Sequence, residues 1–187
     1  MHPTHSPRCG IPSPSRIVPS QGYPGCVGLE RFNALAPDDT VAALLSCCGS
    51  VRWAERIAAH RPYPDLESLL AASDEACYDL LPAELDEALA RESVAPPPLA
   101  GLPGPGTLGT LAAHTALRAA HAEYERRFRH VFVICLDDCP EGELLDHVLS
   151  EIRARLANAP DEERAATSEE LRRLARGRLT RLAACLP

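Results

Sequence analysis

Arg178 is a charged residue on the apolar face of a predicted helix near the end of the chain. With successive residues placed 100° apart, it falls within a stripe of apolar side chains. That stripe consists of Leu171, Leu174, Ala175, Leu179 and Leu182. A buried guanidinium without an anionic partner is costly, so we expect a carboxylate or an anionic ligand beside Arg178. The alternative is an arginine that extends to the edge of the domain or pairs structurally.

Two further candidates lie on the apolar faces of predicted helices. Glu92 lies on a stripe one turn beyond Leu89, although fraying of the helix end would leave it in water. A longer helix places His114 and His121 on one face, two turns apart, which is too far for them to share a metal as neighbours would. A histidine on such a face is usually a hydrogen-bonded core residue, and the alternative makes His121 an acid or base.

The sequence predicts no metal site. Its eight cysteines have no framework spacing, and we interpret most of them as small buried apolar residues. Metal-like spacings are limited to a cluster in the first nine residues and to Cys135 with Cys139, which lack a second pair. A structural zinc needs four converging ligands. No phosphate-binding glycine loop, nucleophile elbow or paired-histidine zinc motif is present.

Composition excludes several classes of protein. The 187 residues are 45% apolar and 24% charged, with a net charge of −7, and all 19 basic residues are arginine. Without a basic block, nucleic-acid binding is not expected. The apolar runs are much shorter than the roughly 20 residues of a membrane span. The N-terminus has no apolar signal segment, so we expect a cytoplasmic protein.

The hydrophobic periodicity predicts an all-α protein. Residues 1–28 are rich in Pro and Ser and are expected to form a disordered tail, while 29–187 form a single-domain bundle of about seven or eight helices. Asp38 and Asp39 can cap one helix and Ser50 the next. Further helices are expected at 66–78, 82–92, 110–130, 143–158 and 161–185. Between them lie an irregular stretch at 95–109 and a β-prone run at 131–135.

The order of short motifs along residues 29–184 resembles the 2-oxo-4-hydroxy-4-carboxy-5-ureidoimidazoline (OHCU) decarboxylases. The motifs are Phe32-Asn33-x-Leu35, Trp53, Arg61-Pro62-Tyr63, Tyr124-Glu125-x-x-Phe128 with Phe132-Val133-Ile134, Arg155-Leu156-x-Asn158 and Arg178-Leu179-x-x-Leu182. The resemblance implies an all-α fold and a homodimeric lyase that acts without a cofactor. It also implies a small-molecule substrate of urate degradation, decarboxylated to (S)-allantoin.

The resemblance also implies site residues. Arg178 matches the arginine on the family's last helix, and Phe132, Val133 and Ile134 match a segment whose backbone faces the substrate. The family's catalytic histidine, in a His-Pro motif, corresponds to Glu92 here, and its Glu-Gln pair has no counterpart. The resemblance therefore implies a divergent member of the family.

Three hypotheses follow from that divergence. In the first, the protein is a working or weakened decarboxylase, in which Glu92 is the acid or base and Arg178 orients the substrate. In the second, a different enzyme uses Glu92, Arg178 and His121 on another small anionic substrate. In the third, a binding or scaffold protein has kept the fold without the chemistry, and Glu92 points to solvent.

Overall fold

The computed structural model describes residues 28–92 and 108–184, which form eight α-helices and one short 3-10 helix. These are α1 (Leu29–Ala34), α2 (Pro37–Leu45), α3 (Val51–Ala59), α4 (Leu66–Tyr78), α5 (Pro82–Glu92), α6 (Leu108–Phe128), η1 (Glu141–Glu143), α7 (Leu144–Arg155) and α8 (Pro160–Ala184). No strand occurs in these two ranges. The predicted all-α class and the predicted number of helices are confirmed.

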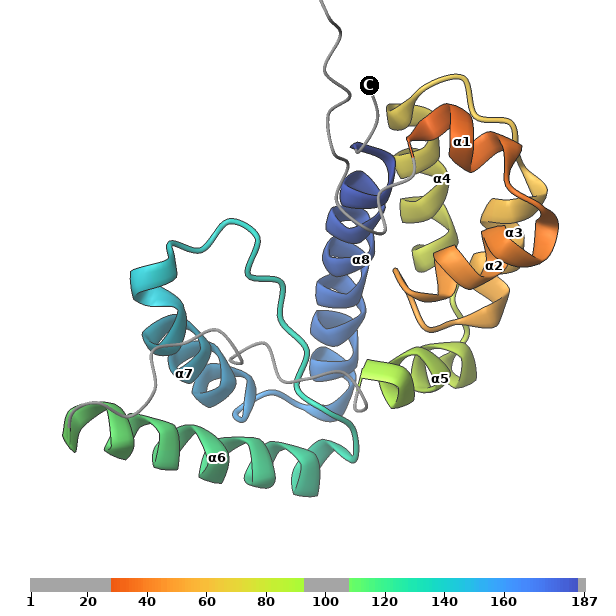
Figure 1. Ribbon diagram of the computed structural model, residues 1–187. Helices are drawn as coiled ribbons and strands as arrows, with labels where there is room; N and C mark the ends of the chain where they lie inside the picture. Colours follow the sequence, from red (N-terminus) through yellow and green to blue (C-terminus); the bar gives the residue numbers. More distant parts are fainter. Residues whose placement is uncertain (1–27, 93–107, 185–187) are drawn as a thin grey trace, which may run out of the picture.

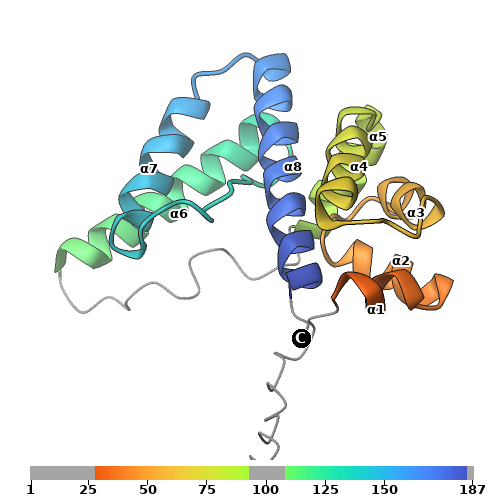
Figure 2. The same cartoon turned by 90° about the horizontal axis from the view of Figure 1, so that it is seen from above.

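Helix α8 is the central element of the described structure. Helices α1 to α5 lie on one side of it and α6 and α7 on the other, as two views at right angles show (Figures 1 and 2). The segment between α6 and α7 passes beside α8 before α7 begins (Figure 1). None of the described helices has the length and apolarity needed to cross a bilayer.

Local capping explains where the early helices begin. The side chain of Ser50 accepts a hydrogen bond from the Trp53 amide at 3.3 Å, which confirms it as the cap of α3. The prediction for Asp38 and Asp39 is wrong in detail. Pro37 occupies the first turn of α2, so the helix begins earlier and both aspartates lie inside its first turn. There their negative charges interact favourably with the positive end of the helix dipole.

Two sequence predictions fall largely outside the described residues. The expected tail at 1–28 is described only at Gly28, and most of the irregular stretch at 95–109 is not described. The last two residues of that stretch belong to α6. The β-prone run at 131–135 is not assigned to a strand; two of its backbone groups bond to side chains of α7 and α8.

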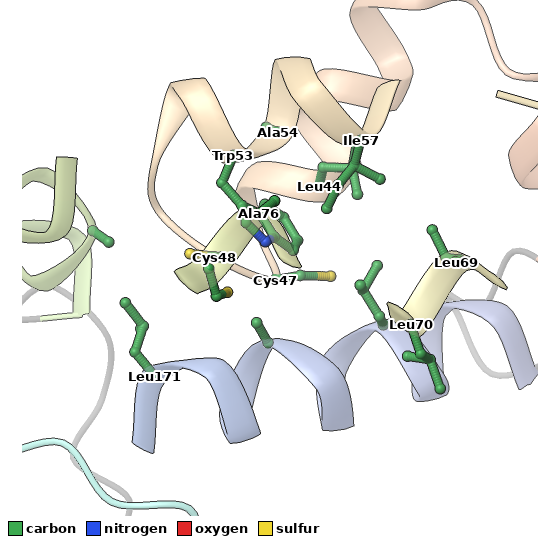
Figure 3. Close-up of a cluster of buried hydrophobic side chains, with 14 of the residues drawn as sticks. Leu44, Cys47, Cys48, Trp53, Ala54, Ile57, Leu69, Leu70, Ala76 and Leu171 are labelled. Atoms are coloured by element: carbon green, nitrogen blue, oxygen red, sulfur yellow. The ribbon is translucent and has the colours of Figure 1, made fainter. Parts of the chain in front are cut away.

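Two apolar clusters flank this segment. The first cluster joins α8 to the N-terminal helices and includes Phe32, Leu44, Trp53, Leu69, Val133, Leu171 and Leu179. Part of it, with α8 along one side, is shown in Figure 3. The second cluster joins α6 and α7 and includes Leu117, Tyr124, Phe132, Ile134, Val148 and Ile152. Alternate residues of the segment thus enter different clusters, as expected for extended backbone.

Two of the sequence motifs have structural roles near α1. The Asn33 side chain donates to the Tyr63 carbonyl at 2.8 Å and accepts from the Tyr63 amide at 2.9 Å. The guanidinium of Arg61 donates to the carbonyls of Phe32 and Leu35 at 2.9 and 3.0 Å. These bonds satisfy carbonyls that the end of a helix leaves without intrahelical partners. They attach α1 to the loop after α3, away from α5.

One backbone conformation gives a stability prediction. Arg129 follows α6 with φ of 66°, and its amide donates to the Glu125 carbonyl at 2.9 Å. Glycine has no side-chain penalty in this left-handed conformation, which commonly ends helices. We therefore expect Arg129→Gly to raise the free energy of unfolding by about 1 kcal/mol, measured by urea denaturation.

A control within α6 separates this effect from a general effect of glycine. Ala122 is exposed in the interior of the same helix. Ala122→Gly should lower the free energy of unfolding by about 1 kcal/mol, because glycine has a poor helix propensity. Equal losses of stability in both variants would show that the conformation at Arg129 carries no strain.

Candidate functional site

Glu92 and Arg178, both singled out in the sequence, meet at the end of α5. Arg178 Nη1 donates to Glu92 Oε1 at 2.6 Å, and Nη2 donates to Oε2 at 2.9 Å. This two-point geometry is the strong form of an arginine–carboxylate pair. The side chains are 13% exposed for Glu92 and 27% for Arg178. The scaffold hypothesis expects Glu92 to point to solvent, but the structure places its side chain against Arg178. The carboxylate predicted beside Arg178 is therefore present.

The close approach of α5 to the loop after α2 places Glu92. A Cβ atom at Gly49 would lie 2.7 Å from Arg91 Cβ, so only glycine allows this contact without a shift. Glu87 of α5 accepts a hydrogen bond from the Val51 amide, at the start of α3, at 3.2 Å. These contacts hold the last turn of α5 against residues 49–51.

Arg178, the other member of the pair, is held in position by α8 and by a backbone carbonyl. Arg178 Nη1 also donates to the carbonyl of Cys47 at 3.0 Å. Leu171 and Leu179, which are fully buried in the first cluster, fix the orientation of the helix that carries Arg178. The guanidinium thus has two protein acceptors at fixed positions and is preorganised.

The guanidinium of Arg178 has donors to spare. A guanidinium has five N–H groups, and three of them bond to Glu92 and Cys47. No described residue accepts from Nε or from the second hydrogen of Nη2. These two donors share one edge of the planar group and can bind a second two-oxygen anion. Arg178 can therefore hold an external anion while it stays bound to Glu92.

Electrostatics around the pair favour a permanent cation. The hydrogen bond with Glu92 raises the pKa of Arg178 above its ordinary value, although burial opposes this. Burial raises the pKa of the neighbouring Cys47 to about 11, so its thiol is neutral. A hydrogen bond with Cys77 lowers the pKa of Cys48, although burial opposes it. Cys47, Cys48 and Cys77 are free and buried, as most cysteines were expected to be.

The segment predicted to bind substrate through its backbone lies between the two clusters. Phe132, Val133 and Ile134 are buried. The Val133 carbonyl accepts from Arg155 Nη1 at 2.7 Å, and the amide of Cys135 donates to Glu170 at 2.7 Å. Within the described ranges, no acceptor bonds to the amides of residues 132–134. Their donors suit the carbonyl or carboxylate oxygens of a small ligand.

His121 lies in the other part of the site. It is half-buried on α6, and its ring packs edge-on against Phe132 with the centroids 5.7 Å apart. Burial lowers its pKa below the ordinary value, although Glu125 opposes this, so the imidazole is neutral near pH 7. The structure gives no contact between His121 and the Glu92–Arg178 pair among the described residues. Its role as an acid or base stays a prediction.

A buried polar network was not singled out in the sequence. Glu163 is fully buried and accepts from Arg155 Nε at 2.8 Å, from Asn158 at 2.8 Å and from the Tyr124 hydroxyl. Arg155 also donates to Thr167 at 2.9 Å. The available signal was the Arg155-Leu156-x-Asn158 motif, with an acidic residue five positions after the asparagine. This network connects α6, α7 and α8 to the carbonyl of Val133.

The described residues around the site contain no metal-binding cluster, and one open cavity lies nearby. No group of three or more His, Cys, Asp or Glu side chains in the described ranges could hold a metal ion. An open cavity of about 540 Å³ lies between α5 and the end of α6, lined by Asp86, Leu89, Glu125, Arg129 and His130 among others. It adjoins α5 on a face that does not include Glu92.

A family model and two solved structures match this chain. A family model described as OHCU decarboxylase matches residues 33–98 and 106–180. A solved OHCU decarboxylase, crystallised in the presence of (S)-allantoin, is 19% identical with a TM-score of 0.58, and the match covers 75% of this chain and 96% of that one. No curated protein matches the sequence.

A second solved structure, an (S)-allantoin synthase, is 15% identical with a TM-score of 0.62. The match covers 82% of this chain and 52% of that protein, so the chain spans about half the length of this relative. At these identities the structural likeness concerns the fold.

Proposed function

This chain belongs to the OHCU decarboxylase family, and on that premise we propose that it converts 2-oxo-4-hydroxy-4-carboxy-5-ureidoimidazoline to (S)-allantoin and CO₂. The pairing of Glu92 with Arg178 is the observation that carries the proposal. Glu92 stands at the position that the resemblance assigns to the catalytic histidine, and Arg178 at that of the family's arginine. The side chains at the two positions lie within hydrogen-bonding distance of each other.

The reaction needs one anion-binding group and one group that moves a proton. The bond between carbon 4 and the carboxylate breaks to release CO₂, its electron pair forms a double bond between carbons 4 and 5, and the pair displaced from the carbon 5–nitrogen double bond takes a proton from water at the ring nitrogen. The 4-hydroxyl then loses its proton as a carbonyl forms, and carbon 5 gains a proton. Addition of that proton on one face gives one enantiomer.

The pair supplies both groups. The Nε and Nη2 edge of Arg178 binds an oxygen pair of the substrate and stays cationic while negative charge develops in the ring. Glu92 takes the hydroxyl proton as a carboxylate and returns it to carbon 5. Backbone amides of the segment 132–134 hold the ureido or ring carbonyl groups. His121 is a second candidate for proton transfer, on the α6 side of the segment.

The remaining expectations are part of the same proposal. The substrate is a small molecule, and the residues named here act without a cofactor. We propose a homodimer that acts in the cytoplasm, as the family resemblance implies. A different small anionic substrate would use the same edge of Arg178, and the assay below distinguishes it.

The proposal is tested by generating the unstable substrate from urate with the two upstream enzymes and adding this protein. Formation of optically active allantoin is followed by circular dichroism. Acceleration over the spontaneous racemic background is expected. Equal rates with and without a folded sample would overturn the proposal and direct the search to other anions that bind Arg178.

Arg178→Lys tests the anion-binding role in this assay. Lysine keeps the charge but cannot donate along two edges at once. We expect kcat/KM to fall about 10- to 100-fold, the equivalent of one charge-assisted hydrogen bond of about 1.5 to 3 kcal/mol. Arg176→Lys is the matched control, because Arg176 is on the same helix and pairs with Asp74 of α4 at 2.7 Å. A similar loss in both variants would contradict the role.

A further inference from the structure

The extended segment after α6 is attached to α8 at successive alternate residues. The amide of Cys135 donates to Glu170 of α8 at 2.7 Å. Two residues later, Asp137 lies against Gly177, where a Cβ atom would come within 2.0 Å of its Oδ2, and it pairs with Arg181 at 3.0 Å. The segment therefore follows α8 toward the end of the helix that carries Arg178 (Figure 1).

The other end of the segment is fixed from α7. Arg155 Nη1 donates to the Val133 carbonyl at 2.7 Å, and its guanidinium lies 4.6 Å from the centre of the Phe132 ring. Arg155 is itself held by buried Glu163. Residues 132–134 are thus held at Val133 by Arg155 and immediately after Ile134, at the Cys135 amide, by Glu170.

The residues that make these two attachments, Arg155 and Glu170, differ in exposure and in their other contacts. Arg155 belongs to the buried network, so its loss would disturb the packing of three helices. Glu170 has a partly exposed side chain, 18% accessible, and its other polar contact with a described residue is an ion pair with Arg173 at 3.2 Å. Its carboxylate can therefore be changed with less damage to the fold.

We infer that Glu170 is a positioning residue, which fixes the backbone of residues 132–134 relative to Arg178 by accepting the Cys135 amide. The inference rests on the proposed function, because it concerns the segment that binds the substrate there. One helix, α8, carries both Glu170 and Arg178, so the bond to Cys135 ties the position of the backbone donors to the helix that carries the guanidinium. Without the bond to Glu170, the amide of Cys135 loses its acceptor and the segment can shift along α8.

The consequence for catalysis is a loss of alignment. Displacement of a reacting group by about 1 Å can lower a rate about 100-fold. We expect Glu170→Ala to lower kcat by about 10- to 100-fold and to lower the enantiomeric purity of the allantoin formed. Glu170→Gln keeps an oxygen that accepts a hydrogen bond from the Cys135 amide, so it should retain most of the wild-type kcat and enantiomeric purity. If Glu170→Ala only destabilised the fold, the loss of kcat would parallel the loss of thermal stability. The enantiomeric purity of the product would then stay unchanged.

The bond itself is measured by hydrogen exchange on the full chain labelled with ¹⁵N-cysteine. Exchange of the Cys135 amide should accelerate about tenfold or more in Glu170→Ala and stay slow in Glu170→Gln. Two controls use neighbours on α8. Arg173→Ala removes the ion pair of Glu170 but leaves the bond to Cys135, and Glu169→Ala removes a glutamate that pairs with Arg172. Both controls should retain slow exchange and wild-type kcat.

The outcomes separate this inference from the proposed function. Unchanged exchange in Glu170→Ala would overturn the inference whatever the activity. Faster exchange with unchanged kcat and enantiomeric purity would overturn the positioning role while the proposed function stands. If the wild-type protein shows no turnover, the proposed function fails and the positioning of substrate fails with it, while exchange still decides whether Glu170 holds the segment.

Discussion

Replacing Glu163 with Gln is expected to lower the free energy of unfolding by about 3 to 5 kcal/mol, the cost of breaking a buried ion pair from one side. Glu163 is fully buried and accepts hydrogen bonds from Arg155, Asn158 and Tyr124. In the variant, the guanidinium of Arg155 remains buried without a counter-charge. Urea denaturation of the full chain measures the loss.

A matched control and a clear opposite result accompany this prediction. Glu55 is an exposed glutamate on α3, so Glu55→Gln should change the free energy of unfolding by less than about 0.5 kcal/mol. A loss below about 1 kcal/mol in Glu163→Gln would mean that Arg155 gains another partner or reaches water. The description of a closed network joining α6, α7 and α8 would then be wrong.

The same residue gives the fold a dependence on acid. Burial alone would raise the pKa of Glu163, but hydrogen bonds from Arg155 and Tyr124 lower it below the ordinary value of 4.5. A lowered pKa in the folded state contributes stability above pH 4.5 that is lost as the pH falls through the folded value. The wild-type protein should therefore lose more stability than Glu163→Gln as the pH falls from 5 to 3.

The fold was predictable from the sequence because its helices carry strong local signals. The stripe that includes Leu171 and Leu179 predicted the face of α8 that enters the core, and Ser50 predicted the start of α3. Helix ends were predicted less accurately, since α2 begins at Pro37, before the two aspartates that were predicted to cap it. Local patterns predict elements, while ends depend on the few residues that compete to cap them.

The candidate site was predictable only in part, because a helical wheel gives the face of a side chain and not its neighbour. Arg178 and Glu92 each fell on an apolar stripe, and their meeting is a consequence of tertiary packing. His121 also fell on such a face, but that face packs in the second cluster beside Phe132. Glu163 lies in the first turn of α8, where an acidic residue is expected for the helix dipole alone. Its partner Arg155 comes from a different helix, so periodicity could not reveal the network.

Glu92→Gln is expected to have the largest effect on turnover. The amide keeps the size of the side chain and one acceptor for Arg178, but it cannot take up a proton. Loss of a group that transfers protons in the reaction lowers kcat by about 10²- to 10⁴-fold. The circular dichroism assay measures this loss, and binding of (S)-allantoin, followed by calorimetry, should change much less.

The split between turnover and binding distinguishes catalysis from the alternative in which Glu92 only holds Arg178 in place. In that alternative, Glu92→Gln keeps most of the hydrogen bonding and therefore most of the activity, and Arg178→Lys is the more damaging change. Asp86→Asn is the control, because Asp86 is on the same helix and pairs with Arg164 at 2.9 Å on the surface. Glu92→His adds a second test. It introduces the residue type that the family resemblance assigns to this position, so it should retain more activity than Glu92→Gln if a proton acceptor is what the position requires.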